Sequence, residues 1–93
     1  MAAPVLDTTT ASGATNALRI TQDLGLEMEI TVAASVTVQA TNHDAAPTSQ
    51  SGVNWVSLGI FTTSNLFTLP PQFRFYRLVW TGNTGTIRVR DNT

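Results

Sequence analysis

The sequence predicts an all-β fold, a small β-sandwich or jelly roll of about eight short antiparallel strands. Two observations lead to this prediction. Apolar and polar residues alternate with a period of two in several short segments, which is the pattern of a half-buried strand. Turn-forming residues separate these segments, and no stretch shows the 3.6-residue period of an amphipathic helix.

The alternation places the expected strands along the chain. The clearest strand is 27–34, where methionine, isoleucine and valine alternate with glutamate and threonine. The residues AASV lie between this strand and the alternating stretch SVTVQAT, and they are interpreted as a tight turn. Residues 27–41 are therefore expected to form a hairpin. A second hairpin is expected over 73–92, where the glycine-flanked turn TGNTG joins two strands. The remaining strands are expected at 4–8, 17–24, 55–61 and 65–71.

One domain accounts for the 93 residues of the chain. The threonine- and serine-rich start predicts a flexible N-terminal arm at 1–13, and residues 14–93 are expected to form a single β-sandwich domain. The start lacks a cationic region followed by an apolar run, so no secretory signal is expected. No segment approaches the ~18 apolar residues of a membrane span. We therefore expect synthesis in a cytoplasm without export, and no membrane partner.

The charged residues are few and restricted in type. They make up 12% of the chain, about half the usual share, and the net charge is −1. Such a weak overall field does not favour nucleic acid as a partner. Cysteine is absent, which removes disulfides and thiolate metal sites, so self-association is the expected source of added stability. Lysine is absent as well, and arginine, the cation better suited to interfaces, supplies all five positive charges.

Residues that carry catalysis or bind metals in other proteins form no recognisable set here. His43 and Asp44 are adjacent in the polar stretch 42–54, which is expected to be a loop. An acid/base pair or a metal site is one interpretation, but neighbouring side chains on an extended chain point apart, so a solvated loop is favoured. Glu27 and Glu29 share a strand face, where a salt bridge to an arginine strand is favoured over calcium binding. The sequence predicts no enzyme, no cofactor and no metal site.

Two rows of side chains are expected on the first strand of the second hairpin. Tyr76, Leu78 and Trp80 recur at every second position and are interpreted as a core-facing row. The alternative is a platform, shared with Trp55, on which a sugar ring or a nucleobase stacks. If the row faces inward, Phe75 points outward and is partly exposed, as is common at protein interfaces.

Three arginines are expected on one outer face. If the apolar residues of the last strand face the core, Arg77, Arg88 and Arg90 lie together across the second hairpin. Three like charges repel one another unless acidic groups lie among them. Glu27 and Glu29 on a neighbouring strand are one source of such groups, and an acidic patch on a second subunit is the other.

The second half of the chain resembles the C-terminal part of a discoidin-like, galactose-binding sandwich. The resemblance lies in VTVQAT, NWVSLGIF, FYRLVWTG and GTIRV, and it covers roughly residues 35–91. It implies a packing role for Trp55 and an outward position for Arg77. The stretch 42–54 is longer than the usual tight turn before the tryptophan, and no cluster of loop aromatics or arginines matches a sugar or lipid site. The resemblance therefore implies a fold and no ligand.

The chain also resembles the head decoration, or cement, proteins of tailed bacteriophages. The shared features are small size, a start rich in threonine, serine, alanine and glycine, the absence of cysteine and lysine, and low charge. The resemblance implies a virion structural protein on the capsid surface, made in the host cytoplasm. It further implies a homo-oligomer, with a trimer favoured, whose partner is the major capsid protein.

The function predicted from the sequence is therefore capsid decoration, in which many moderate contacts together stabilise the shell. One alternative is a small carbohydrate-binding or adhesin module, with Trp55 or Trp80 exposed beside the 42–54 loop. Another is a tail-tube or connector component that forms rings. The residues expected to contact a partner are Phe75, Arg77, Arg88 and Arg90, together with Asn42, His43 and Asp44.

Overall fold

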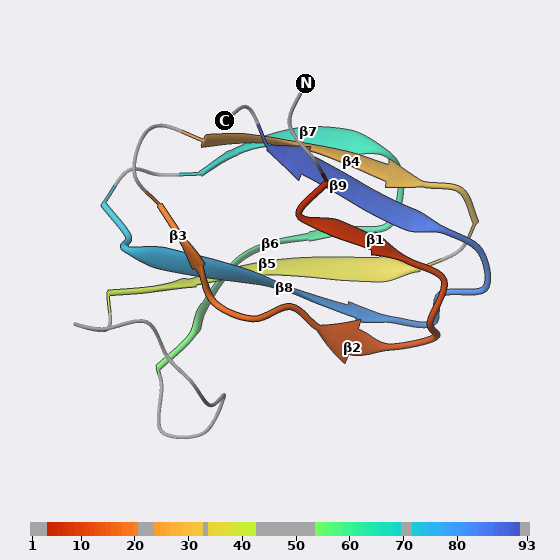
Figure 1. The fold of residues 1–93 in the computed structure, drawn as a ribbon, viewed down its shortest axis with the longest axis horizontal. Coiled ribbons are helices and arrows are strands. Elements are labelled where there is room, and N and C mark those ends of the chain that lie inside the picture. Colours follow the sequence, from red (N-terminus) through yellow and green to blue (C-terminus); the bar gives the residue numbers. More distant parts are fainter. Residues whose placement is uncertain (1–3, 21–23, 33, 43–53, 70–71, 92–93) are drawn as a thin grey trace.

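The computed structural model describes residues 4–20, 24–32, 34–42, 54–69 and 72–91. In these residues the chain forms strands and no helix, which confirms the predicted all-β fold (Figure 1). The strands are β1 (Leu6–Thr8), β2 (Gly13–Ala14), β3 (Leu18–Arg19), β4 (Leu24–Ile30), β5 (Ser35–Thr41), β6 (Val56–Phe61), β7 (Asn65–Leu69), β8 (Phe75–Thr81) and β9 (Ile87–Asp91).

The strands pair into two antiparallel sheets that pack against each other as a sandwich. The first sheet has the order β1-β9-β4-β7, and the second has the order β2-β8-β5-β6, with β3 also paired to β8. Among the strand pairs of the described residues, only β5 and β6 are consecutive along the chain. Nearly every other connection passes from one sheet to the other. This is the connectivity of a jelly roll, the second of the two architectures that the sequence predicts.

The short strands β2 and β3 behave as one interrupted strand. Both run antiparallel along the edge of β8, and the pairing register shifts by one residue between them. Thr15 bridges the interruption, because its amide donates to the Leu78 carbonyl (2.9 Å) and its hydroxyl accepts from the Leu78 amide (3.0 Å). Counted as one strand, the two segments bring the sandwich to the number of strands that the sequence predicts.

Both predicted hairpins are wrong. β4 and β5 lie in opposite sheets, and so do β8 and β9, so the connections after β4 and β8 are arches between the sheets. Alternation shows which face of a strand is buried, but it does not show which strand lies alongside. The two arches are neighbours and Thr31 joins them. Its hydroxyl donates to the Thr86 carbonyl (3.1 Å) and accepts from the Thr86 amide (2.9 Å).

Asn83 forms the corner of the arch that follows β8. Its side chain is buried; Nδ2 donates to the carbonyls of Thr10 (3.0 Å) and Gly85 (3.1 Å), and Oδ1 accepts from the Gly85 amide (3.1 Å). The Trp80 indole N–H donates to the same Thr10 carbonyl (3.2 Å). Gly85 approaches the neighbouring arch so closely that a Cβ there would lie 2.5 Å from Val32 Cγ2. A side chain at that position would not fit without movement.

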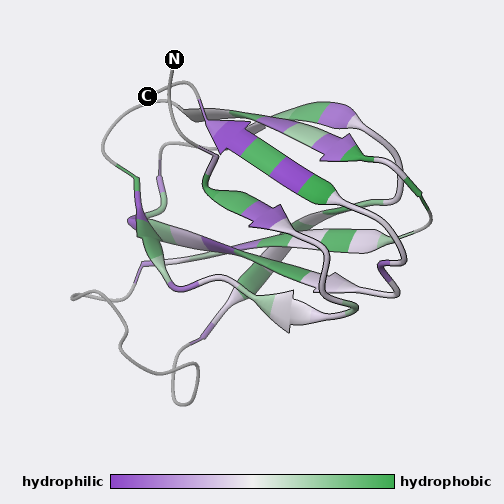
Figure 2. Cartoon of the chain, turned by 45° about the vertical axis from the view of Figure 1, so that its right-hand side comes forward, coloured by the Kyte–Doolittle hydropathy of each residue, from purple (hydrophilic) through white to green (hydrophobic). Residues whose placement is uncertain are grey.

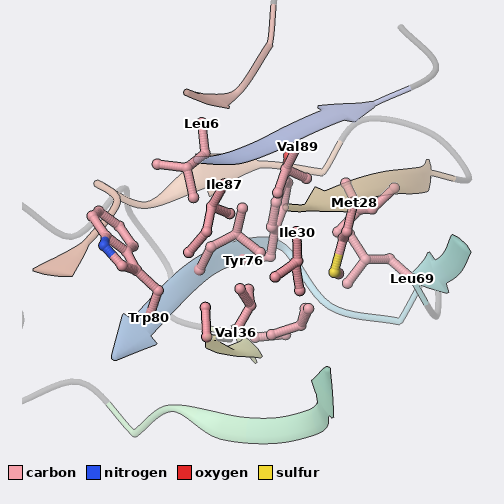
Figure 3. Close-up of a cluster of buried hydrophobic side chains, with 14 residues drawn as sticks. Leu6, Met28, Ile30, Val36, Leu69, Tyr76, Trp80, Ile87 and Val89 are labelled. Carbon is pink, nitrogen blue, oxygen red and sulfur yellow. The ribbon is translucent and has the colours of Figure 1, made fainter. Parts of the chain in front are cut away.

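The core lies between the two sheets, and both sheets contribute to it (Figure 3). Tyr76, Leu78 and Trp80 face inward and are buried, so the predicted core-facing row is confirmed. They meet Ile87 and Val89 from the opposite sheet. The other members of the core are Leu6, Leu26, Met28, Ile30, Ala34, Val36, Val38, Ala40 and Leu69.

The described part of the segment 1–13 contributes to the sandwich, which differs from the expected N-terminal arm. β1 pairs with β9, with Leu6 opposite Val89, and Leu6 is a buried member of the core. The structure agrees here with the strand expected at 4–8. The physical reason is that β1 covers one edge of β9, whose main-chain groups would otherwise be unpaired.

Candidate interaction surfaces

A ladder of acidic residues and arginines covers the outer face of the first sheet, where β1, β9 and β4 lie side by side. The register places Glu27 opposite Arg90 and Glu29 opposite Arg88, and it also places Asp7 opposite Arg88. Figure 2 shows the alternating polar and apolar bands along β9. The prediction that the two glutamates pair with a neighbouring arginine strand is confirmed.

The ladder neutralises its own arginines. Arg90 Nη1 lies 3.4 Å from Glu27 Oε1 and donates a short hydrogen bond to Glu29, which raises the pKa of Arg90 above its ordinary value. Arg88 lies between Asp7 Oδ2 (3.4 Å) and Glu29 Oε2 (3.9 Å). These side chains are accessible to solvent, so each pair contributes little to stability. Arg88 and Arg90 are thus matched by carboxylates of their own chain.

Arg77 does not share a face with Arg88 and Arg90, and the prediction of three clustered arginines is therefore wrong. β8 and β9 belong to different sheets, so the outward side of β8 lies on the opposite surface of the sandwich from the ladder. The error follows directly from the assumed hairpin. Because the three arginines are not clustered, no acidic partner is needed to offset repulsion among them.

Arg77 belongs instead to a row of polar contacts across β8, β5 and β6. Its guanidinium lies over the Trp55 ring, with 4.5 Å from Cζ to the ring centroid, and its Nε donates to Gln39 Oε1 (2.7 Å). Gln39 Nε2 in turn donates to Ser57 Oγ (3.2 Å). Burial lowers the pKa of Arg77. The cation–π contact and the hydrogen bonds hold Arg77 outward, as predicted, but against its own chain.

Phe75 is buried, which contradicts the expectation of an outward, partly exposed ring. It is 3% exposed and lies outside the central core cluster. Strands cover it on both sides, because Arg19 of β3 and Thr41 of β5 are its direct neighbours. The Arg19 guanidinium lies 5.9 Å from the ring centroid. Phe75 therefore supports Arg19 and does not itself offer a contact surface.

An apolar edge runs along β6 and β7. These strands end the second and the first sheet, and the rings of Phe61 and Phe67 meet edge-on at 5.2 Å to join them. Three side chains on this edge project into solvent: Val56 is 43% exposed, Ile60 is 66% exposed and Leu66 is 75% exposed. In the part of the chain that the structure describes, each strand is paired on one side only, so main-chain groups along its other side face away from the sheet; the Leu66 amide donates to Asn65 Oδ1 (2.8 Å).

A basic cleft of about 540 Å³ is lined by residues at the end of β3 and the start of β8. Figure 1 shows these two strand ends on the left. The backbone around it is firmly connected. The Ile20 amide donates to the Arg74 carbonyl (2.8 Å), and the Arg74 amide donates to the Thr41 carbonyl (3.1 Å). The cleft is lined by Arg19, Ile20, Asn42, Gln72, Phe73, Arg74 and Phe75.

The residues predicted as contacts are thus distributed over three places. Asn42 and Phe75 line the basic cleft, Arg77 lies on the outer face of the second sheet, and Arg88 and Arg90 lie in the ladder. His43 and Asp44 lie outside the described residues. The sequence interpretation overlooked Arg19, Ile60 and Leu66. For the last two a signal existed, because no charged residue occurs between positions 45 and 73.

No protein-family model, curated protein or solved structure matches this chain significantly. In the part of the chain that the structure describes, no group of three or more His, Cys, Asp or Glu side chains is placed to hold a metal ion. Among the same residues there is no helix long and apolar enough to span a membrane.

Proposed function

We propose that this protein is a structural component of a bacteriophage virion, a capsid decoration protein that self-associates and binds the major capsid protein. The observation that supports this most is the apolar edge. Ile60 and Leu66 are large, apolar and mostly exposed, and they stand on strands that pair on one side only within the described residues. Exposed apolar surface next to an open edge marks a protein contact site.

The composition of the edge favours a second copy of the same chain. β6 and β7 contain no charged residue and no proline, so neither of these two devices against edge-to-edge pairing is present. Identical surfaces meet in a self-association, and charges would then face like charges. A charge-free stretch avoids that repulsion.

Binding of the protein to the capsid shell would depend on several identical contacts made at once. A homo-oligomer presents the same surfaces several times, so that moderate affinity at each site gives stable binding to a repetitive shell. The jelly roll is used by viral capsid proteins and also by lectins, so the fold agrees with a virion role without deciding it.

The test is the oligomeric state, measured by light scattering at several concentrations, for the wild type and for Ile60→Lys and Leu66→Lys. We expect a defined wild-type oligomer, and a dissociation constant raised by at least about tenfold in both variants, because burial in the interface would remove water from the charged lysine. Thr84→Lys is the matched control, since it adds the same charge at an exposed position in the arch after β8. A wild type that stays monomeric at every concentration would refute self-association.

Capsid binding is tested separately, by co-sedimentation with shells of the phage that encodes the chain. A decoration protein saturates the shell at a fixed ratio of copies to capsid subunits. Binding that is absent or never saturates would remove decoration and leave a self-associating protein of another role.

A carbohydrate-binding module is the second candidate, favoured by a hollow of about 340 Å³ lined by Thr41, Asn42, Asn54, Val56 and Phe73. Amide groups beside an aromatic ring suit a sugar. The version of this candidate that relied on Trp80 is wrong, because Trp80 is buried in the core. Trp55 follows Asn54 directly, so a glycan titration monitored by tryptophan fluorescence tests this candidate. Unchanged emission together with no heat of binding would exclude it.

A further inference from the structure

We propose that the basic cleft is a binding site for a carboxylate group, with Arg19 as the cation that binds it. The proposal goes beyond the proposed function and does not depend on the apolar edge. It rests on three features of the cleft: the availability of Arg19, the rigid support beneath it, and the mixed lining of the cavity.

Arg19 differs from the other arginines in its surroundings. Arg88 and Arg90 are held by carboxylates, and Arg77 is held by Gln39 and Trp55. Arg19 lies on a ring, 5.9 Å from the Phe75 centroid, and no carboxylate of the described residues lies within ion-pair distance of it. A guanidinium of this kind keeps its hydrogen-bond donors available for a ligand.

The support beneath Arg19 restricts where its head can go. Phe75 is buried, and it lies opposite Arg19 in the register of β3 and β8. Two backbone hydrogen bonds tie Arg74 to the ends of β3 and β5, through Ile20 and Thr41. The side chain of Arg19 therefore starts from backbone that its neighbouring strand fixes in place. Preorganised cations lose less conformational entropy when they bind.

The lining selects the class of ligand. The planar guanidinium of Arg19 matches the flat, two-oxygen geometry of a carboxylate, and the amide groups of Asn42 and Gln72 in the lining add neutral donors. Ile20 and Phe73 supply apolar wall for a short carbon chain. One binding cation in a chain of net charge −1 is too few for the extended phosphate contacts of a nucleic acid. A volume of about 540 Å³ accommodates an acidic side chain with part of its segment, or a small organic acid.

The test follows backbone amide chemical shifts during titration with glutarate, with neutral glutaramide as the matched probe. We expect saturable shifts at Asn42, Gln72 and Phe73 with glutarate and none with glutaramide. In Arg19→Gln the dissociation constant should rise by about tenfold, because a charge-assisted hydrogen bond is lost. Arg88→Gln, which removes an equal charge from the ladder, should bind as the wild type does.

Two further measurements separate the outcomes. A peptide with one central glutamate that binds at least about tenfold more tightly than glutarate assigns the carboxylate to a protein segment, whereas equal affinity assigns it to a small acid. The site is refuted if glutarate and glutaramide behave alike, if Arg19→Gln binds normally, or if inorganic phosphate binds more tightly than either carboxylate. Light scattering on Arg19→Gln should show the wild-type oligomer, so that failure here is distinguishable from failure of self-association.

Discussion

Replacing Asn83 by alanine should destabilise the sandwich through the arch after β8. The substitution removes the donor to Thr10 and Gly85 and the acceptor for the Gly85 amide, three hydrogen bonds around a buried side chain. At about 1 kcal/mol net for each bond the loss is about 3 kcal/mol. The Trp80 indole still satisfies the Thr10 carbonyl, so about 2–3 kcal/mol is the expected decrease in the free energy of unfolding.

Urea unfolding at one fixed protein concentration measures this decrease, since association would otherwise change the apparent stability. With a slope of about 1 kcal/mol per molar urea, the midpoint should fall by about 2–3 M. Asn65→Ala is the control. The Asn65 side chain is exposed and accepts only from the next amide along the chain among the contacts described, so its loss should cost less than about 0.5 kcal/mol. If Asn83→Ala unfolds within about 0.5 kcal/mol of the wild type, the arch does not depend on this side chain.

Two other substitutions test the packing of the sandwich. Burial, and then the nearby Asp91 carboxylate, raise the pKa of Tyr76 above its ordinary value of about 10. The folded state therefore holds the phenol proton more tightly than the unfolded state, so stability should fall as the pH rises above about 10. In Tyr76→Phe the free energy of unfolding, measured with urea, should no longer fall between about pH 8 and about pH 11. The same decrease in this variant as in the wild type would contradict the assignment of the effect to Tyr76. Gly85→Ala should lower the free energy of unfolding by about 1–3 kcal/mol, because the added Cβ would lie 2.5 Å from Val32 Cγ2. Gly25→Ala is the control and should leave the free energy of unfolding nearly unchanged, because nothing lies within 4 Å of the Cβ added there. Equal effects of the two glycine substitutions, measured by urea unfolding, would contradict the close approach.

The sequence predicted the faces of the strands well. Met28 and Ile30 were expected inside with Glu27 and Glu29 outside, and this arrangement is observed. The reason is physical: a period of two leaves only two choices for a strand, and glutamates do not occupy the buried one. The salt bridges to β9 followed from the same pattern, because the outward arginines of one strand needed acidic neighbours.

Strand pairing could not be predicted in the same way. The turn TGNTG is compatible with a hairpin and also with an arch, and local turn chemistry does not distinguish them. The deciding contacts are distant in sequence: Asn83 binds the Thr10 carbonyl, and Thr31 binds Thr86. The position of Arg77 was mistaken for this reason alone. The basic cleft was also beyond prediction, because three separate segments meet to form it.

The edge strands on the two sides of the sandwich differ in length and charge, which favours association along one side only. On one side the edge strands are short, with three residues in β1 and two each in β2 and β3, and β1 carries Asp7. Short, charged edges are poor templates for another strand. On the other side β6 has six residues, β7 has five, and neither has a charge. A second copy that pairs along β6 would extend the second sheet without disturbing Arg77 and Gln39, which lie on inner strands of that sheet. Strands β1 and β9, which carry Asp7, Arg88 and Arg90 of the ladder, lie in the other sheet and would not be covered by such pairing.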